Sequence, residues 1–358
     1  MFPVRRAVRL SLCILRVASQ ATFFLEAQRL LLRLLRPVPR DHLCRAEARV
    51  LSGVRSPLQH LFIPDGNGHR IHVIHVSQTN RNAPSIVLLH GHSMSAAFWC
   101  RNFDDLVAMG YRVYAVDLLG WGRSSRPLFR GRSAAEAVDW FLRSLSGVID
   151  GLHLGSFTLV GHSLGAYLSM EYTKRTPHRV DQLVMVSPAA TVRPIPVSRA
   201  LYFSLPPQSI IRRGGLLGFL LFTLAYPRSE MYIQNRLRDY TYHLAAQMPP
   251  SGENAVRPII RFTGLRRAEC VRPLIENLSL FRVPVQIICG QYDSSMPVEG
   301  VFQLFHHMKS QGFNVDLDVV EGSDHCPMLE KPAHFSEIMA SITKRGQSLA
   351  IEAHSMMR

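Results

Sequence analysis

A serine between two glycines is the first feature with chemical potential: residues 161–165 read Gly-His-Ser-Leu-Gly, with Ser163 at the centre. The apolar run before it predicts a strand, and the amphipathic stretch after it predicts a helix, which is the context in which a G-x-S-x-G turn presents a nucleophile. The glycines remove Cβ atoms that would clash in so tight a turn. An ordinary strand-to-helix turn is the alternative, so the prediction depends on partners elsewhere.

Those partners follow later apolar runs. Asp293 comes after residues 283–289 and a glycine turn, and His325 comes after residues 315–320 and a second glycine turn. The order serine, acid, histidine is the one that this arrangement of strands uses. His325 is predicted to be the base, and Asp293 to hold the imidazole and stabilise its charged form. Asp324 is a rival acid, although adjacent residues rarely aim at each other.

A second loop is expected to stabilise negative charge. Residues 88–93 (Leu-Leu-His-Gly-His-Ser) follow an early buried strand. In this context the backbone N–H groups of His92 and Leu164 are predicted to form the oxyanion hole. The imidazoles of His90 and His92 are interpreted as packed loop side chains.

Strands and helices alternate along the chain, and this alternation predicts how the loops are positioned. Continuous apolar runs, typical of strands buried on both faces, occur at residues 85–90, 112–118, 157–160, 182–187, 283–289 and 315–320. Residues 60–64 and 70–77 flank the turn Asp-Gly-Asn-Gly and predict a hairpin. Helical patterns lie between the runs, at residues 134–149 and 164–176 for example. The expected class is α/β, an α/β-hydrolase fold with a mostly parallel central sheet and helices on both faces.

The alternation stops near residue 190 and resumes near residue 281. We therefore divide the chain into a first core part at 58–190, an inserted helical cap at 191–280, a second core part at 281–346 and a C-terminal tail at 347–358.

The first 40 residues form a separate basic segment. They contain eight arginines and one acid, Glu26, and so hold +7 of the net charge of +15. No uncharged run reaches the roughly 18 residues of a membrane span. The Arg-rich, acid-poor amphipathic pattern favours a mitochondrial transit peptide. A helix lying on an anionic membrane surface and a first helix packed on the body are the alternatives.

Composition excludes several classes of protein. With 47% hydrophobic and 19% charged residues the chain is able to bury a large core. The six cysteines show no CxxC pair, and neither a disulfide framework, a metal site nor a cofactor is predicted. No nucleic-acid motif accompanies the positive charge, so an anionic membrane is the expected partner surface.

At this point a family resemblance appears. Residues 88–95, 114–127 and 161–165 resemble the α/β-hydrolase subfamily of comparative gene identification-58, N-acyl-phosphatidylethanolamine lysophospholipase and the cardiolipin-specific deacylase. Residues 239–253 (Asp-Tyr-Thr-Tyr-His, then Ala-Gln, then Pro-Ser-Gly-Glu) look like that subfamily's cap motif. The resemblance covers about residues 58–340. It implies a phospholipid or lysophospholipid substrate and a serine carboxylic-ester hydrolase.

The resemblance also leaves two other functions open. The subfamily often has H-x4-D at the catalytic histidine, a pattern linked to acyl transfer, whereas this chain has Glu330 five residues after His325. A lysophospholipid acyltransferase is therefore one alternative. Because some relatives lack the serine, a lipid-binding coactivator is the other.

Overall fold

The computed structural model describes residues 40–356, except residues 78, 79, 81, 193, 265, 266 and 280 and most of 196–235. The predicted basic segment at 1–40 therefore lies outside the described residues, apart from Arg40. That residue begins helix α2 (Arg40–Leu51), whose apolar side packs on the body through Leu43, Ala46 and Val50.

An eight-stranded sheet forms the centre of the molecule, in the order β1-β2-β4-β3-β5-β6-β10-β11. Its first two strands form the predicted antiparallel hairpin, and β2 runs antiparallel to β4; every later neighbour is parallel. The strands are β1 (Leu58–Pro64), β2 (Arg70–Val76), β3 (Ser85–Leu89), β4 (Arg112–Val116), β5 (Phe157–His162), β6 (Val180–Val186), β10 (Val285–Gly290) and β11 (Val315–Val320). The predicted α/β-hydrolase fold is confirmed.

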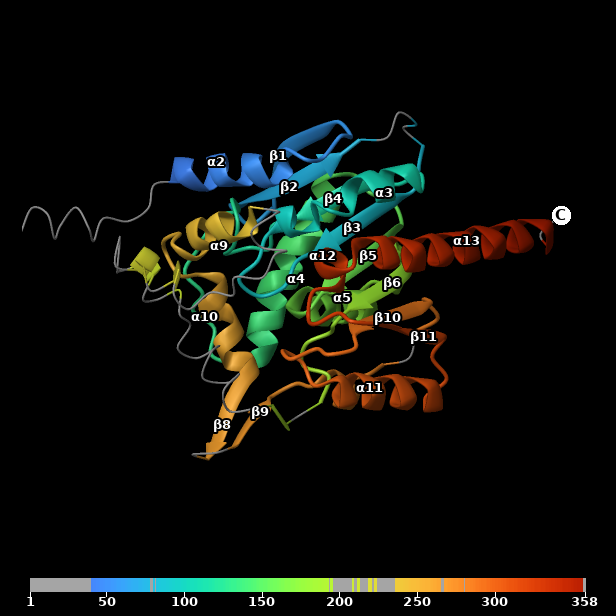
Figure 1. Ribbon diagram of the computed structural model, residues 1–358. Helices are drawn as coiled ribbons and strands as arrows, with labels where there is room; N and C mark the ends of the chain where they lie inside the picture. The colour runs from blue at the N-terminus through green and yellow to red at the C-terminus, as the bar shows by residue number, and fades with distance from the viewer. Residues whose placement is uncertain are drawn as a thin grey trace, which may run out of the picture.

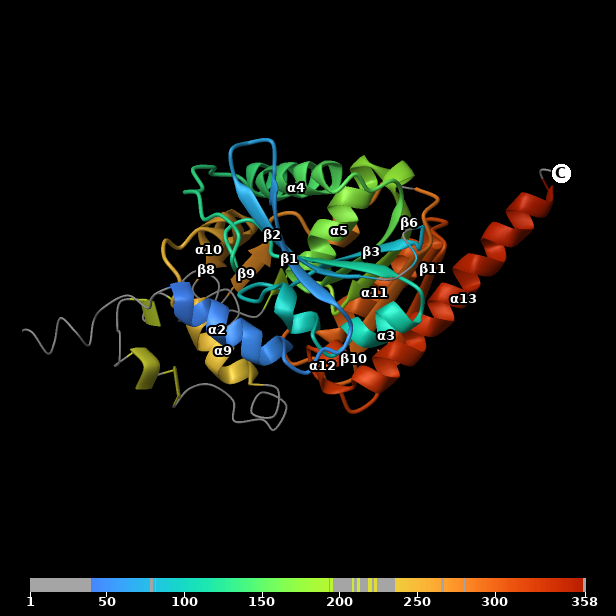
Figure 2. The ribbon, with the colours of Figure 1, turned by 90° about the horizontal axis from the view of Figure 1, so that it is seen from above.

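Helices cover both faces of this sheet, as Figures 1 and 2 show. They are α3 (Phe103–Ala108), α4 (Ala134–Gly151), α5 (Leu164–Arg175), α11 (Val298–Ser310), α12 (Pro327–Glu330) and α13 (Pro332–Met356). In β3, Val87 and Leu89 join the core under α4, α5 and α11, whereas Ile86 and Leu88 join the core under α3, α12 and α13. Successive strand residues point to opposite faces, so a continuous apolar run is what a doubly covered strand needs.

The described part of the segment between β6 and β10 lies outside the central sheet, beside one end of it (Figure 1). Its described part contains α9 (Leu237–Ala245) and α10 (Gly252–Val256). It also contains a three-stranded antiparallel sheet of β7 (Pro194–Ile195), β9 (Arg267–Cys270) and β8 (Ile260–Gly264), where the sequence predicts only helices. Helix α9 lies beside α2 in both views.

The C-terminal helix α13 continues to Met356 and so includes most of the predicted C-terminal tail at 347–358. Within the described residues, none of the helices combines the length and the apolar character needed to cross a bilayer.

Candidate active site

Ser163 stands at the junction of β5 and α5. It is the residue before the first turn of α5, its backbone has φ 53° and ψ −115°, and it is 4% exposed. A positive φ is uncommon for a residue with a side chain and marks a strained turn. The backbone N–H of Ser163 donates to the carbonyl oxygen of Val186 at 2.9 Å, which holds the turn against β6.

The two glycines of the turn are required by close backbone contacts. A Cβ atom at Gly161 would lie 2.4 Å from the carbonyl carbon of Gly165. A Cβ atom at Gly165 would lie 2.5 Å from the carbonyl oxygen of Leu89, at the end of β3. Any larger residue would therefore push α5 away from β5 and β3. The glycine spacing thus brings the β3 loop next to the serine.

The loop after β3 passes beside Ser163. A Cβ atom at Gly91 would lie only 3.1 Å from Cβ of Ser163. His92 follows directly, and burial lowers the pKa of its imidazole to about 4. Leu164 is the first residue of α5, so its N–H belongs to the turn where a helix leaves N–H groups without intrahelical acceptors. Leu164 therefore follows Ser163 directly, and His92 follows the glycine that lies beside it; their role as oxyanion donors stays a prediction.

The structure brings Asp293 and His325 together. Nδ1 of His325 lies 2.9 and 3.0 Å from the two carboxylate oxygens of Asp293. One of these oxygens, Oδ1, also accepts from the backbone N–H groups of Ser295 at 2.9 Å and Met296 at 2.7 Å. Burial alone would raise the pKa of Asp293, but the hydrogen bond and charge of His325, with these N–H groups, lower it. The carboxylate is therefore ionised at neutral pH.

The rival acid, Asp324, has a different partner. Its carboxylate accepts from the N–H of Ser294 at 2.7 Å and from the Ser294 hydroxyl at 2.9 Å. These bonds join the loop of His325 to the loop of Asp293. Asp324 is thus placed to connect the two loops, and Asp293 is the carboxylate that meets the imidazole.

Two further residues, His162 and Glu330, contact the loop of His325, and the sequence patterns did not predict these contacts. The ring of His162, the residue before Ser163, lies 4.8 Å from the His325 ring, centre to centre, and its Nε2–H donates to the His325 carbonyl oxygen at 2.9 Å. Burial, then the charge of His325, lowers the pKa of His162 to about 3, so it stays neutral. Glu330 contacts the loop on both sides of His325. The sequence signal that could have pointed to His162 is its position directly before Ser163 in the motif Gly-x-Ser-x-Gly.

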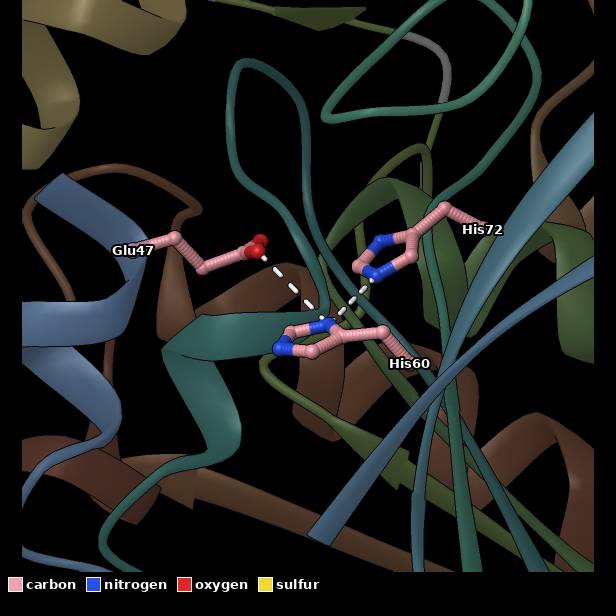
Figure 3. A group of neighbouring side chains, drawn as sticks. All are labelled: Glu47, His60 and His72. Atoms are coloured by element: carbon pink, nitrogen blue, oxygen red, sulfur yellow. Dashed lines mark hydrogen bonds and ion pairs between the residues drawn. The ribbon is translucent and has the colours of Figure 1, made fainter. Parts of the chain in front are cut away.

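A second group of titratable residues lies on α2, β1 and β2. Glu47, His60 and His72 converge there (Figure 3), with His60 Nδ1 2.8 Å from His72 Nε2 and 3.8 Å from a Glu47 oxygen. The Arg123 guanidinium, however, lies 2.8 Å from that same oxygen and 3.1 Å from His60 Nδ1. Because Arg123 already supplies the positive charge, these side chains form an ion-paired network and leave little electrostatic need for a metal.

This network also reaches the inserted segment. Glu47 accepts from the hydroxyl of Tyr240 in α9 at 3.1 Å, and that hydroxyl lies 2.6 Å from the Ser95 hydroxyl in the loop after β3. On the other side His72 Nδ1 lies 2.6 Å from Asp117, after β4. The network therefore holds α9 against α2 and the loop after β3.

Comparison with known proteins gives the family. Residues 86–337 match the sequence profile of the alpha/beta hydrolase family. The "1-acylglycerol-3-phosphate O-acyltransferase ABHD5" of Homo sapiens is 33% identical over 70% of this chain and 75% of that protein. A "Probable 1-acylglycerol-3-phosphate O-acyltransferase" of Oryza sativa subsp. japonica is 32% identical over 72% of this chain and 66% of its own length. The "(Lyso)-N-acylphosphatidylethanolamine lipase" of Bos taurus is 28% identical over 84% and 91%.

Solved structures share the fold at lower identity. A membrane phospholipase A described as a bacterial virulence factor has a TM-score of 0.62 and 19% identity, over 96% of this chain and 99% of that one. Naproxen esterase from Bacillus subtilis has a TM-score of 0.60 and 21% identity, over 84% and 96%. With the sequence matches, these similarities establish that the chain belongs to the α/β-hydrolase family, in the subfamily of comparative gene identification-58.

Proposed function

We propose that the chain is a serine hydrolase that cleaves acyl esters of phospholipids or lysophospholipids through an acyl-enzyme on Ser163. The observation that supports this most directly is the bond of 2.9 Å between Nδ1 of His325 and the Asp293 carboxylate. It fixes the imidazole proton on Nδ1 and leaves Nε2 as the acceptor of a proton. His325 packs on His162, whose neighbour in the chain is Ser163.

The chemistry then has two halves. In the first, Ser163 Oγ attacks the ester carbonyl carbon while its proton passes to Nε2 of His325, and the N–H groups of His92 and Leu164 stabilise the oxyanion. Such a donor typically contributes about 3 kcal/mol in the transition state. The leaving alcohol takes the proton from His325 as the tetrahedral species collapses. In the second half Nε2 of His325 takes a proton from water as the water oxygen attacks the acyl carbon. The bond from that carbon to Ser163 Oγ then breaks, Oγ regains the proton from His325, and the fatty acid is released.

The substrate class rests on the relatives. The proteins from cattle, human and rice are named for reactions of acyl groups on phosphoglycerides. The subfamily resemblance at residues 239–253 lies in the inserted segment, where Ser251 and Glu253 are buried against the core. A lipid acyl chain is therefore the acyl donor that we propose.

Incubation with defined phospholipids and lysophospholipids tests this function. We expect Ser163→Ala to lower the rate of fatty-acid release by at least about 10³-fold, because the nucleophile is removed. Ser144→Ala is the matched control, since Ser144 is a buried serine within α4 and should leave the rate unchanged. Equal release by the Ser163 variant and the wild type would refute the mechanism.

An acyltransferase is the second candidate, because the human and rice relatives carry that name. In that reaction a lysophospholipid hydroxyl, in place of water, would take the acyl group from an acyl-CoA donor. Labelled acyl-CoA supplied with a lysophospholipid separates the two outcomes by the product formed. A lipid-binding coactivator without catalysis is distinguished by a fluorophosphonate probe, which would then fail to label Ser163 in folded protein.

We also propose, from the sequence alone, that residues 1–40 direct mitochondrial import and that the protein acts at an anionic membrane surface. The +7 charge of that segment is the support for both. A fluorescent fusion of residues 1–40 that stays cytosolic would exclude import. Stable binding of the same fusion to membranes would favour the interfacial helix instead.

A further inference from the structure

Glu330 ends the short helix α12, and both of its carboxylate oxygens contact the loop that contains His325. Oε2 accepts from the backbone N–H of Asp324 at 2.5 Å and from the Ser323 hydroxyl at 2.9 Å. Oε1 accepts from the backbone N–H of Cys326 at 3.1 Å. The two N–H groups belong to the residues immediately before and after His325. One carboxylate therefore holds the backbone on both sides of the imidazole.

The spacing between His325 and Glu330 follows from the helix. Pro327 begins α12, and the Cys326 carbonyl oxygen accepts from the N–H groups of Leu329 and Glu330, each at 2.9 Å. This single turn brings the Glu330 side chain back beneath the loop. Leu329 is buried in the core with no exposed surface, which anchors the turn. The glutamate is thus presented to the loop from a fixed element.

Further contacts hold the loop from other directions. His162 Nε2–H donates to the His325 carbonyl oxygen at 2.9 Å. The Asp324 carboxylate binds Ser294, next to Asp293, and the Ser323 carbonyl oxygen accepts from the N–H of Tyr292 at 2.9 Å. The backbone of residues 323–326 is therefore bonded to β5, to the loop of Asp293 and to α12. Of these three supports, Glu330 is the one side chain that accepts from two backbone N–H groups at once.

From this arrangement we infer that Glu330 is a positioning residue for His325, and that it takes no part in activating an acyl acceptor. The inference rests on the proposed function, because it assigns Glu330 a role in orienting the base of that reaction. Both carboxylate oxygens are bonded to donors of the loop. Both oxygens are thus occupied by the loop, and an oxygen could take a proton from a second substrate only by giving up one of these hydrogen bonds.

The test compares Glu330→Gln with Glu330→Asp. Glutamine keeps the shape but presents an amide N–H₂ to one of two backbone N–H groups that both need an acceptor. We expect kcat to fall about 100-fold with KM nearly unchanged, because a misplaced base costs about that much. Aspartate keeps both acceptors on a side chain one methylene shorter, and we expect kcat within about tenfold of wild type.

The matched control is Glu321→Gln, which neutralises an exposed carboxylate at the start of the same loop. It should leave kcat and the labelling rate of Ser163 by a fluorophosphonate unchanged, while Glu330→Gln slows that labelling about as much as it lowers kcat. Should Glu330→Gln fail to fold, Ser323→Ala removes one of the three donors and should give a smaller loss, about three- to tenfold. A Glu330→Gln protein with wild-type kcat would overturn the inference.

The role in acyl transfer is tested separately. With labelled acyl-CoA and a lysophospholipid, the ratio of transfer to hydrolysis should be the same in wild type, Glu330→Gln and Glu330→Asp. Selective loss of transfer in the glutamine variant would overturn the inference. A wild type that the probe does not label would instead defeat the proposed function. In that case amide hydrogen exchange in residues 322–331 tests the role of Glu330. Faster exchange in Glu330→Gln than in Glu321→Gln supports the contact, and equal exchange in the two variants refutes it.

Discussion

Replacing Asp293 by asparagine tests the central contact of the site. The carboxylate has two different neighbours: Oδ1 accepts from the N–H groups of Ser295 and Met296, and Oδ2 lies 2.9 Å from Nδ1 of His325. The amide oxygen of asparagine will stay at the Oδ1 position, because the flipped amide would face two N–H donors with its own N–H₂ group. The amide nitrogen is then left facing His325.

The size of the effect follows from that orientation. An N–H₂ group facing Nδ1 makes this nitrogen an acceptor and moves the imidazole proton to Nε2, where it cannot accept the Ser163 proton. Oδ1 lies 3.0 Å from Nδ1, but it is already shared by two N–H donors and is a weak acceptor for a third. The same exchange in a serine protease triad lowers kcat about 10⁴-fold. That corresponds to about 5 kcal/mol of transition-state stabilisation.

The assay is ester hydrolysis with the fluorophosphonate labelling rate as a second readout. Asp324→Asn is the control, since that carboxylate is adjacent to His325 in the chain but bonds Ser294. Weakening those hydrogen bonds should cost less than about tenfold in kcat. If Asp324→Asn lost as much activity as Asp293→Asn, or if Asp293→Asn stayed within tenfold of wild type, the assignment of the acid would be wrong.

Three further predictions follow from the geometry. Gly91→Ala should reduce kcat by at least about 100-fold while the protein stays folded, because its Cβ would lie 2.8 Å from Nδ1 of His162; circular dichroism with ester hydrolysis checks this. Arg212→Met should lower the free energy of unfolding by about 3–5 kcal/mol in urea, since it leaves the 2%-exposed Glu253 unpaired, and an additional Glu253→Leu should recover most of the loss. Burial lowers the pKa values of His92 and His162 to about 4 and about 3, so the folded protein favours their neutral forms. The free energy of unfolding is therefore highest above pH 6.5 and falls as the pH decreases from 6.5 toward those pKa values. Each should cost about 1 kcal/mol by pH 5.5, and urea midpoints at pH 7.5 and 5.5 that agree would contradict this.

The main strands were predictable because their burial on both faces leaves a strong pattern in the sequence. Residues 315–320 are strand β11 as predicted, although this edge strand is only partly buried. The other strand boundaries shift by a few residues where pairing extends or ends the run. In β5, for example, the strand continues to His162, which pairs with Val186 of β6. The small sheet of β7, β8 and β9 was not predictable. Its strands are short, and β7 pairs with β9 from more than 70 residues away.

The nucleophile turn was determined by the sequence itself. Glycines at 161 and 165 are needed wherever a strand, a serine and a helix meet so closely, and their spacing is a local property. The order of Ser163, Asp293 and His325, each after a strand, was likewise visible in the pattern of apolar runs. Local sterics and burial leave a record in neighbouring residues, so this part of the site could be predicted from the sequence.

Only the tertiary structure decided which groups face the imidazole. From the sequence Asp293 and Asp324 were both candidates, and their difference arises from two loops meeting after β10 and β11. Glu330 looked like a variant of a transfer motif until α12 placed it under the base loop. Hydrogen bonds are short and directional, so their partners depend on how distant elements pack, and that packing is absent from any local pattern.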